Sequence, residues 1–108
     1  MSFVKIATID QIPLGTMASF TVDGKEILIA NYNGNYYAMN LKCTHMGGDL
    51  SKGKLEGRVV TCPRHGSKFD VTTGECISGP RLGPIKLKVK NEIIYAVKVE
   101  GKNILVDI

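Results

Sequence analysis

Two short segments of the chain each pair a cysteine with a histidine: residues 43–45 read Cys-Thr-His and residues 62–65 read Cys-Pro-Arg-His. Together they contain both histidines and two of the three cysteines of the protein. Structural zinc sites usually group like ligands, with two cysteines close together followed by two histidines. One thiolate and one imidazole from each segment instead suit two metal ions that need different ligand sets. The sequence therefore predicts a metal centre at which the two segments converge.

The residues around these pairs resemble the ligand loops of Rieske-type proteins. The resemblance covers residues 43–48 (Cys-Thr-His-Met-Gly-Gly), residues 62–70 (Cys-Pro-Arg-His-Gly-Ser-Lys-Phe-Asp) and the proline-containing residues 79–84. In that family two cysteines hold one iron of a [2Fe–2S] cluster and two histidines hold the other. The resemblance implies one cluster per chain, with Cys43 and Cys62 on the inner iron and His45 and His65 on the outer iron.

The resemblance also implies which residues surround the cluster. Ser67 occupies the position of a serine that hydrogen-bonds to a cluster sulfur, whereas Phe69 stands where high-potential members have a tyrosine and carries no hydroxyl. Glycine turns let the backbone fold closely over a cluster, and backbone N–H groups that such turns leave unpaired are expected to point at sulfur. The residues implied beside the cluster are Gly47, Gly48, Gly66, Ser67, Phe69 and Pro80. The residues implied at an apolar docking rim for partner proteins are His45, Met46, His65 and Leu82.

Gly48 and Arg64 narrow the expected reduction potential. Rieske proteins of the quinol-oxidising class have cysteines at these two positions, joined as a disulfide that this chain cannot form. The missing disulfide and the missing tyrosine hydroxyl predict a potential in the lower or middle part of the family range, which runs from about −150 to +300 mV.

Most of the chain outside these loops has the pattern of short strands and tight turns, which predicts an all-β, single-domain fold over residues 1–108. Asp23-Gly24, Asn33-Gly34 and residues 100–102 are expected hairpin turns, and residues 8–14 are expected to hold one helical turn with Asp10 as its cap. The strands are expected at residues 3–7, 17–22, 26–30, 36–39, 58–61, 69–71, 85–89, 93–99 and 104–108.

Glycines are dense between residues 41 and 83, where the β-branched runs become short. We therefore expect residues 41–83 to form a loop-rich, cluster-binding subdomain inserted into a base made of residues 1–40 and 84–108. The resemblance implies the same architecture, an antiparallel β-sandwich or barrel base with the cluster-binding subdomain at one end. Alternation of apolar residues and lysine over residues 85–90 predicts a half-buried strand with a solvated face.

Composition excludes several classes of protein. The net charge of +4 comes from scattered lysines without interleaved aromatic residues, which argues against nucleic-acid binding. No apolar run approaches the roughly 18–20 residues of a membrane helix, and the first residues lack the pattern of a signal peptide. Only Cys76 remains once the expected ligands are set aside, so a disulfide framework is excluded and Cys76 is expected to be a buried apolar residue. We expect a soluble, cytoplasmic protein.

These features predict a monomeric one-electron carrier, a Rieske-type ferredoxin, rather than an enzyme. Its expected partners are a ferredoxin reductase and a terminal oxidoreductase such as an oxygenase. A Rieske oxygenase also needs a mononuclear iron held by two further histidines and a carboxylate, and this chain has no further histidine. Two alternatives remain open: a small redox subunit of a larger enzyme, similar to that of nitrite reductase, and a zinc-stabilised binding module without redox activity.

Overall fold

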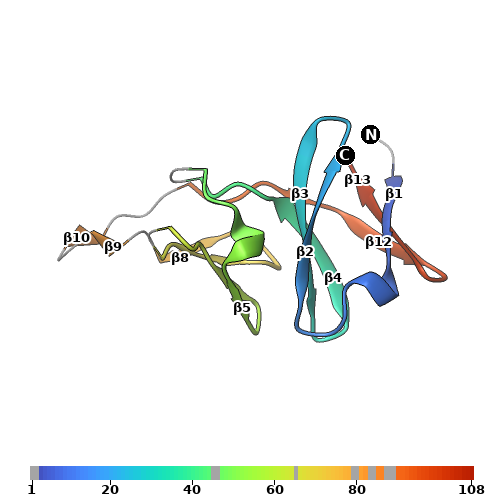
Figure 1. Ribbon diagram of the computed structural model, residues 1–108, viewed down its shortest axis with the longest axis horizontal. Coiled ribbons are helices and arrows are strands. Elements are labelled where there is room, and N and C mark those ends of the chain that lie inside the picture. The colour runs from blue at the N-terminus through green and yellow to red at the C-terminus, as the bar shows by residue number, and fades with distance from the viewer. Residues whose placement is uncertain (1–2, 45–46, 65, 79–80, 83–84, 87–89) are drawn as a thin grey trace.

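Most of the regular secondary structure consists of antiparallel strands in the computed structural model (Figure 1), which describes residues 3–44, 47–64, 66–78, 81–82, 85–86 and 90–108. Two single-turn 3₁₀ helices, η1 (Ile9–Gln11) and η2 (Leu50–Lys52), accompany the strands. The strands are β1 (Phe3–Thr8), β2 (Met17–Val22), β3 (Lys25–Tyr32), β4 (Asn35–Asn40), β5 (Lys54–Glu56), β6 (Val59–Thr61), β7 (Lys68–Asp70), β8 (Cys76–Ser78), β9 (Arg81–Leu82), β10 (Ile85–Lys86), β11 (Ile94–Tyr95), β12 (Val97–Glu100) and β13 (Asn103–Asp107).

The strands form three sheets and one separate hairpin. The central sheet has the order β11-β4-β3-β2, a second sheet has the order β1-β13-β12, and a third has the order β5-β6-β7-β8. Strands β9 and β10 form a two-stranded sheet, with no other partner among the described residues. In Figure 1 the strands β2, β3 and β4 lie between β5 and β8 on one side and β1, β12 and β13 on the other. The expected all-β, antiparallel fold is confirmed.

Strand β3 separates two hydrophobic cores. Ile27 and Ile29 belong to the core shared with β1 and β13, whereas Leu28 and Ala30 belong to the core shared with the third sheet. Successive residues of a strand point to opposite faces, so a strand covered on both sides is apolar throughout. Each fully buried aliphatic side chain stabilises the fold by about 1.5–3 kcal/mol, and three of these four residues are completely buried.

The expected hairpin turns are confirmed in the central sheet. Asp23 and Gly24 both have positive φ angles, of 49° and 77°, between β2 and β3. Asn33 and Gly34 repeat this geometry between β3 and β4, with φ of 56° and 86°. Two consecutive residues of positive φ match the right-handed twist of the strands that they connect.

Residues 93–99 do not form the single strand expected from their apolar pattern. β11 pairs with β4 in the central sheet, whereas β12 pairs with β13 in the second sheet. The chain changes sheets at Ala96, whose carbonyl accepts the Asp107 N–H at 2.9 Å. The sequence of this stretch carries no signal of such a change, because Tyr95 of β11 and Val97 of β12 pack against the same hydrophobic core.

One further expectation is corrected and another stays untested. Thr8, rather than Asp10, is the N-cap of the helical turn η1, and its N–H donates to Gln11 Oε1 at 2.8 Å. β10 pairs with β9 in antiparallel orientation, but residues 87–89 lie outside the described residues, so the half-buried strand predicted for residues 85–90 stays a prediction. None of the helices among the described residues is long and apolar enough to cross a membrane.

Candidate metal centre

The first cysteine segment is the tip of a short antiparallel ladder that follows β4. Leu50 N–H donates to Leu41 O at 3.1 Å, and Cys43 N–H donates to Gly48 O at 2.8 Å. The loop closes on itself because Gly47 N–H returns to Cys43 O at 3.0 Å. Gly47 has a φ of 68°, which lets the chain reverse within this space. Cys43 is therefore held at the entrance of a tight loop that contains Thr44 and His45.

The second cysteine segment is the tip of the hairpin between β6 and β7 and closes in the same way. Cys62 N–H donates to Ser67 O at 2.7 Å, and Gly66 N–H returns to Cys62 O at 3.2 Å. Gly66 also has positive φ, 79°. In both loops the cysteine N–H pairs with the carbonyl five residues on, and the N–H four residues on pairs with the cysteine carbonyl. The two loops thus present their cysteines from equivalent backbone positions.

The two loops are in direct contact. A β-carbon built on Gly48 would lie 2.8 Å from Cys62 Sγ and 3.3 Å from Cγ of Arg64. The aliphatic stem of Arg64 therefore covers Gly48. In the quinol-oxidising class, these two positions carry the cysteines whose disulfide joins the loops. The absence of a side chain at residue 48 leaves room for the Cys62 sulfur and brings the two segments together.

All three cysteines are buried in the core between the central and third sheets. Cys43, Cys62 and Cys76 are 3%, 4% and 2% exposed, and Phe69 of the same core is completely buried. The expectation that Cys76 is a buried apolar residue is confirmed. Its N–H donates to Asn91 Oδ1 at 2.9 Å, which ties β8 to the segment before β11.

Ser67 is the buried serine of the second loop, and its hydroxyl is unsatisfied in the part of the chain that the structure describes. The residue is completely buried, and its Oγ has no hydrogen-bond partner among the described residues. Leaving a buried hydroxyl unpaired costs about 1–3 kcal/mol, so such a group in a native fold calls for a partner. Sulfur of an iron–sulfur cluster is an acceptor of this kind.

The expectation that backbone N–H groups left unpaired by the glycine turns point at sulfur stays a prediction, but it does not concern the N–H groups of Gly47 and Gly66. Each of these two donates to the carbonyl of the cysteine four residues earlier. The glycines therefore shape the loops, and donors to a cluster must come from other groups of these loops.

Part of the expected site lies outside the described residues. His45, Met46, His65 and Pro80 are among these positions, and for Leu82 the structure describes only the backbone. The remaining described residues contain no group of three or more histidine, cysteine, aspartate or glutamate side chains that could hold a metal ion. The two buried thiols and the unsatisfied Ser67 hydroxyl nevertheless fit a [2Fe–2S] cluster, with the two histidines as the expected remaining ligands.

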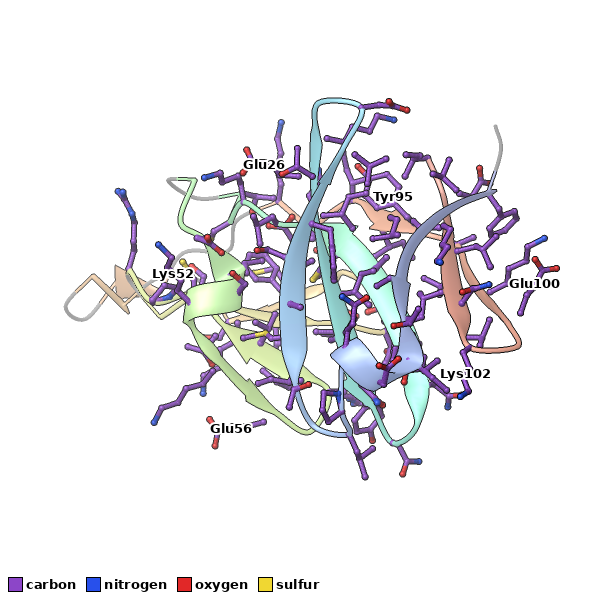
Figure 2. All side chains as sticks on the ribbon, turned by 45° about the vertical axis from the view of Figure 1, so that its right-hand side comes forward. Glu26, Lys52, Glu56, Tyr95, Glu100 and Lys102 are labelled. Atoms are coloured by element: carbon purple, nitrogen blue, oxygen red, sulfur yellow. The ribbon has the colours of Figure 1, made fainter. Side chains whose placement is uncertain are left out.

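The structure adds one residue that the sequence did not indicate. Glu92 is 5% exposed, and its Oε1 accepts the N–H of Thr44 at 2.9 Å. Burial raises the pKa of this carboxyl from 4.5 to about 7, against the opposing effect of the Thr44 hydrogen bond. Burial, and then the Glu92 charge, raise the pKa of Tyr95, which is labelled in Figure 2. No local pattern could have found this contact, because 48 residues separate its partners.

Comparison with known proteins agrees with this geometry. The family model described as the Rieske [2Fe-2S] domain matches residues 2–98. The chain belongs to the Rieske [2Fe-2S] family. As a Rieske domain it carries one [2Fe–2S] cluster, and the expectation stated for the cofactor is confirmed.

Individual relatives cover almost the whole Rieske domain. The chain is 38% identical over 98 residues to the ferredoxin component of the naphthalene 1,2-dioxygenase system of Pseudomonas aeruginosa, covering 91% of this chain and 88% of that protein. Among solved structures, the ferredoxin of carbazole 1,9a-dioxygenase from Nocardioides aromaticivorans is 32% identical, with a TM-score of 0.81 over 98% of this chain and 97% of that one. A complex of reduced oxygenase and oxidized ferredoxin in carbazole 1,9a-dioxygenase matches at 27% identity and a TM-score of 0.76, covering 96% of this chain and 91% of the matched chain.

Proposed function

We propose that this Rieske domain is a one-electron carrier that accepts an electron from a reductase and passes it to a terminal oxygenase. The observation that supports it most directly is the contact between the two ligand loops, which brings Gly48 against Cys62 in a chain with only two histidines. One cluster uses both histidines, so none remains for the mononuclear iron of an oxygenase. The relatives named above are ferredoxin components that this chain matches over nearly their whole length.

The proposal assigns each part of the site. Cys43 and Cys62 bind the inner iron and His45 and His65 the outer iron, with Ser67 donating to a cluster sulfur. Residues 41–83 form the cluster-binding subdomain on a base of residues 1–40 and 84–108. The surroundings of the cluster comprise Gly47, Gly48, Gly66, Phe69 and Pro80.

The proposed partners dock on a rim around the two histidine ligands. His45, Met46, His65 and Leu82 form the docking rim, and an electron reaches the oxygenase through the imidazoles. The carrier is proposed to be a monomer that meets each partner transiently, in the cytoplasm. The complex of an oxygenase with a ferredoxin among the similar structures supports this mode of association.

Metal analysis followed by reconstitution tests the proposal. The purified protein is expected to contain two irons and two acid-labile sulfides per chain, to absorb visible light and to bleach on reduction. It is then mixed with a reductase and an oxygenase of a related dioxygenase system, and product formation is measured with and without it. Colourless protein with one zinc would support the binding module instead. Stable co-purification with a larger enzyme would favour the redox-subunit alternative.

A further inference from the structure

Glu92 is a buried carboxylate attached to the first ligand loop. Its Oε1 accepts the N–H of Thr44, the residue between Cys43 and His45. Thr44 is held a second time, because its Oγ1 donates to the carbonyl of Lys90 at 2.6 Å. The segment just before β11 therefore fixes the peptide between two proposed ligands from outside the loop.

The backbone of Glu92 is itself fixed by the turn between β7 and β8. Glu92 N–H donates to Gly74 O at 2.7 Å, and a β-carbon on Gly74 would clash with the Glu92 carbonyl oxygen. Asn91, its neighbour, receives the Cys76 N–H. The carboxylate thus projects from an anchored position and does not adjust freely to the loop.

The carboxylate has no compensating charge in the described part of the chain. No ion pair involves Glu92, and its Oε2 is buried without a hydrogen-bond partner among the described residues. Burying such a group opposes folding, because a charge loses its hydration without receiving a partner. Among the described residues, the carboxylate receives only the hydrogen bond from the Thr44 N–H in return for this cost, which points to a role beyond folding.

We propose that Glu92 is a positioning residue that orients the Thr44 peptide so that Cys43 and His45 reach the cluster, and that its negative charge lowers the reduction potential. This inference rests on the proposed ligand assignment. The orienting effect acts through the hydrogen bond, since the Thr44 peptide joins directly to the Cys43 carbonyl carbon. The effect on the potential follows because adding an electron near a poorly solvated negative charge is unfavourable.

Two substitutions in the full-length, cluster-containing protein separate these effects. Glu92→Gln retains an oxygen acceptor of the same shape but removes the charge. Glu92→Met retains the length of the side chain but removes both acceptor and charge. Glu56→Gln is the matched control, because Glu56 lies on β5 with an exposed side chain that points away from the ribbon (Figure 2).

The measurements are cluster loss under a metal chelator, the visible circular dichroism of the oxidised protein and the midpoint potential at pH 8.5. We expect Glu92→Gln to raise the potential while its spectrum and rate of cluster loss stay close to those of the parent. Glu92→Met is expected to lose its cluster faster, by a factor on the order of 10, although its apoprotein is at least as stable as the parent. Glu56→Gln should change none of these.

The inference is overturned if Glu92→Gln leaves the potential unchanged or lowers it, or if Glu92→Met loses its cluster at the parent rate with an unchanged spectrum. A merely structural glutamate would instead destabilise the apoprotein of both variants without moving the potential. If the unsubstituted protein contains no iron or sulfide, the proposed function fails. If it binds a normal cluster and the variants behave like it, only the role of Glu92 fails.

Discussion

Gly48 lies so close to Cys62 that any side chain at residue 48 would compete with the thiol for space, since its β-carbon would stand 2.8 Å from Sγ. The stem of Arg64, 3.3 Å away, closes the other side of this gap. This gap lies where the two ligand loops meet. A substitution that fills it therefore tests whether the two loops bind one metal centre.

Substituting Gly48→Ala is expected to weaken cluster binding, because Cys62 must leave the position in which it faces the first loop. We expect an affinity for the cluster lower by a factor on the order of 10, measured as iron and sulfide per chain and as the rate of bleaching with a chelator. Gly34→Ala is the control, since it introduces strain of about 1–2 kcal/mol at a positive φ far from the loops. Equal loading of the two variants would contradict the proposed convergence of the loops.

The two proposed cysteine ligands and the third buried cysteine are expected to respond differently to substitution. Cys43→Ser and Cys62→Ser should abolish the normal visible spectrum, because each removes a thiolate from the inner iron. Cys76→Ala should retain the spectrum and lose about 1 kcal/mol of stability, since Cys76 only packs in the core. Absorption spectra and thermal unfolding distinguish these outcomes. A normal spectrum in Cys62→Ser would remove Cys62 from the ligand set.

Removing the Ser67 hydroxyl is expected to lower the reduction potential. A hydrogen bond to a charged acceptor contributes about 1.5–3 kcal/mol. Only the part of this free energy gained on reduction shifts the potential, so roughly 65–130 mV for one electron is the upper bound of the decrease. Because the hydroxyl has no partner in the described polypeptide, Ser67→Ala should leave the apoprotein as stable as before or more stable. Voltammetry of the loaded protein and unfolding of the apoprotein test both parts, with the exposed Ser19→Ala as control. An unchanged potential would show that Ser67 is only a turn residue and donates no hydrogen bond to the cluster.

Adding a hydroxyl at Phe69 is expected to raise the potential. Phe69 is completely buried in the core that contains both proposed cysteine ligands, so the oxygen of Phe69→Tyr gains most by donating to a cluster sulfur. Phe20→Tyr, a half-buried position on β2 beside the other core, controls for the added oxygen. Voltammetry of both variants checks the prediction, and a potential for Phe69→Tyr at or below that of the parent would contradict it.

Glu92 predicts a pH dependence of stability. Its pKa is about 7 in the folded protein and near the ordinary 4.5 when unfolded, so between these values the folded state holds the extra proton. The contribution of Glu92 to the free energy of unfolding is fully present below pH 4.5. It is lost as the pH rises through 7, which lowers the free energy of unfolding by at most about 3 kcal/mol. The midpoint of thermal unfolding should therefore fall less steeply over this window in Glu92→Gln than in the parent. Parallel pH profiles for the two proteins would show that Glu92 does not titrate there.

The sequence alone determined the family, the cofactor and the class of fold. Ligand residues can be recognised from a short stretch of sequence, because a cysteine and a histidine of the same loop must lie within a few residues of each other. Turn residues can also be recognised from the sequence, because Asp23-Gly24 and Asn33-Gly34 adopt positive φ angles that few other residues tolerate. Runs rich in β-branched and aromatic residues then predicted most of the longer strands.

Only the tertiary structure decided which distant residues meet. The division of residues 93–99 between two sheets depends on which neighbours β11 and β12 find, and their apolar pattern is compatible with either sheet. The contact of Glu92 with Thr44 likewise joins segments 48 residues apart, and a single glutamate in a lysine-rich stretch looks like a solvated surface residue. The residue types that ligands and turns require can be recognised in short stretches of sequence. Burial of a charge or a close approach to a sulfur instead arises only when packing brings separate segments together.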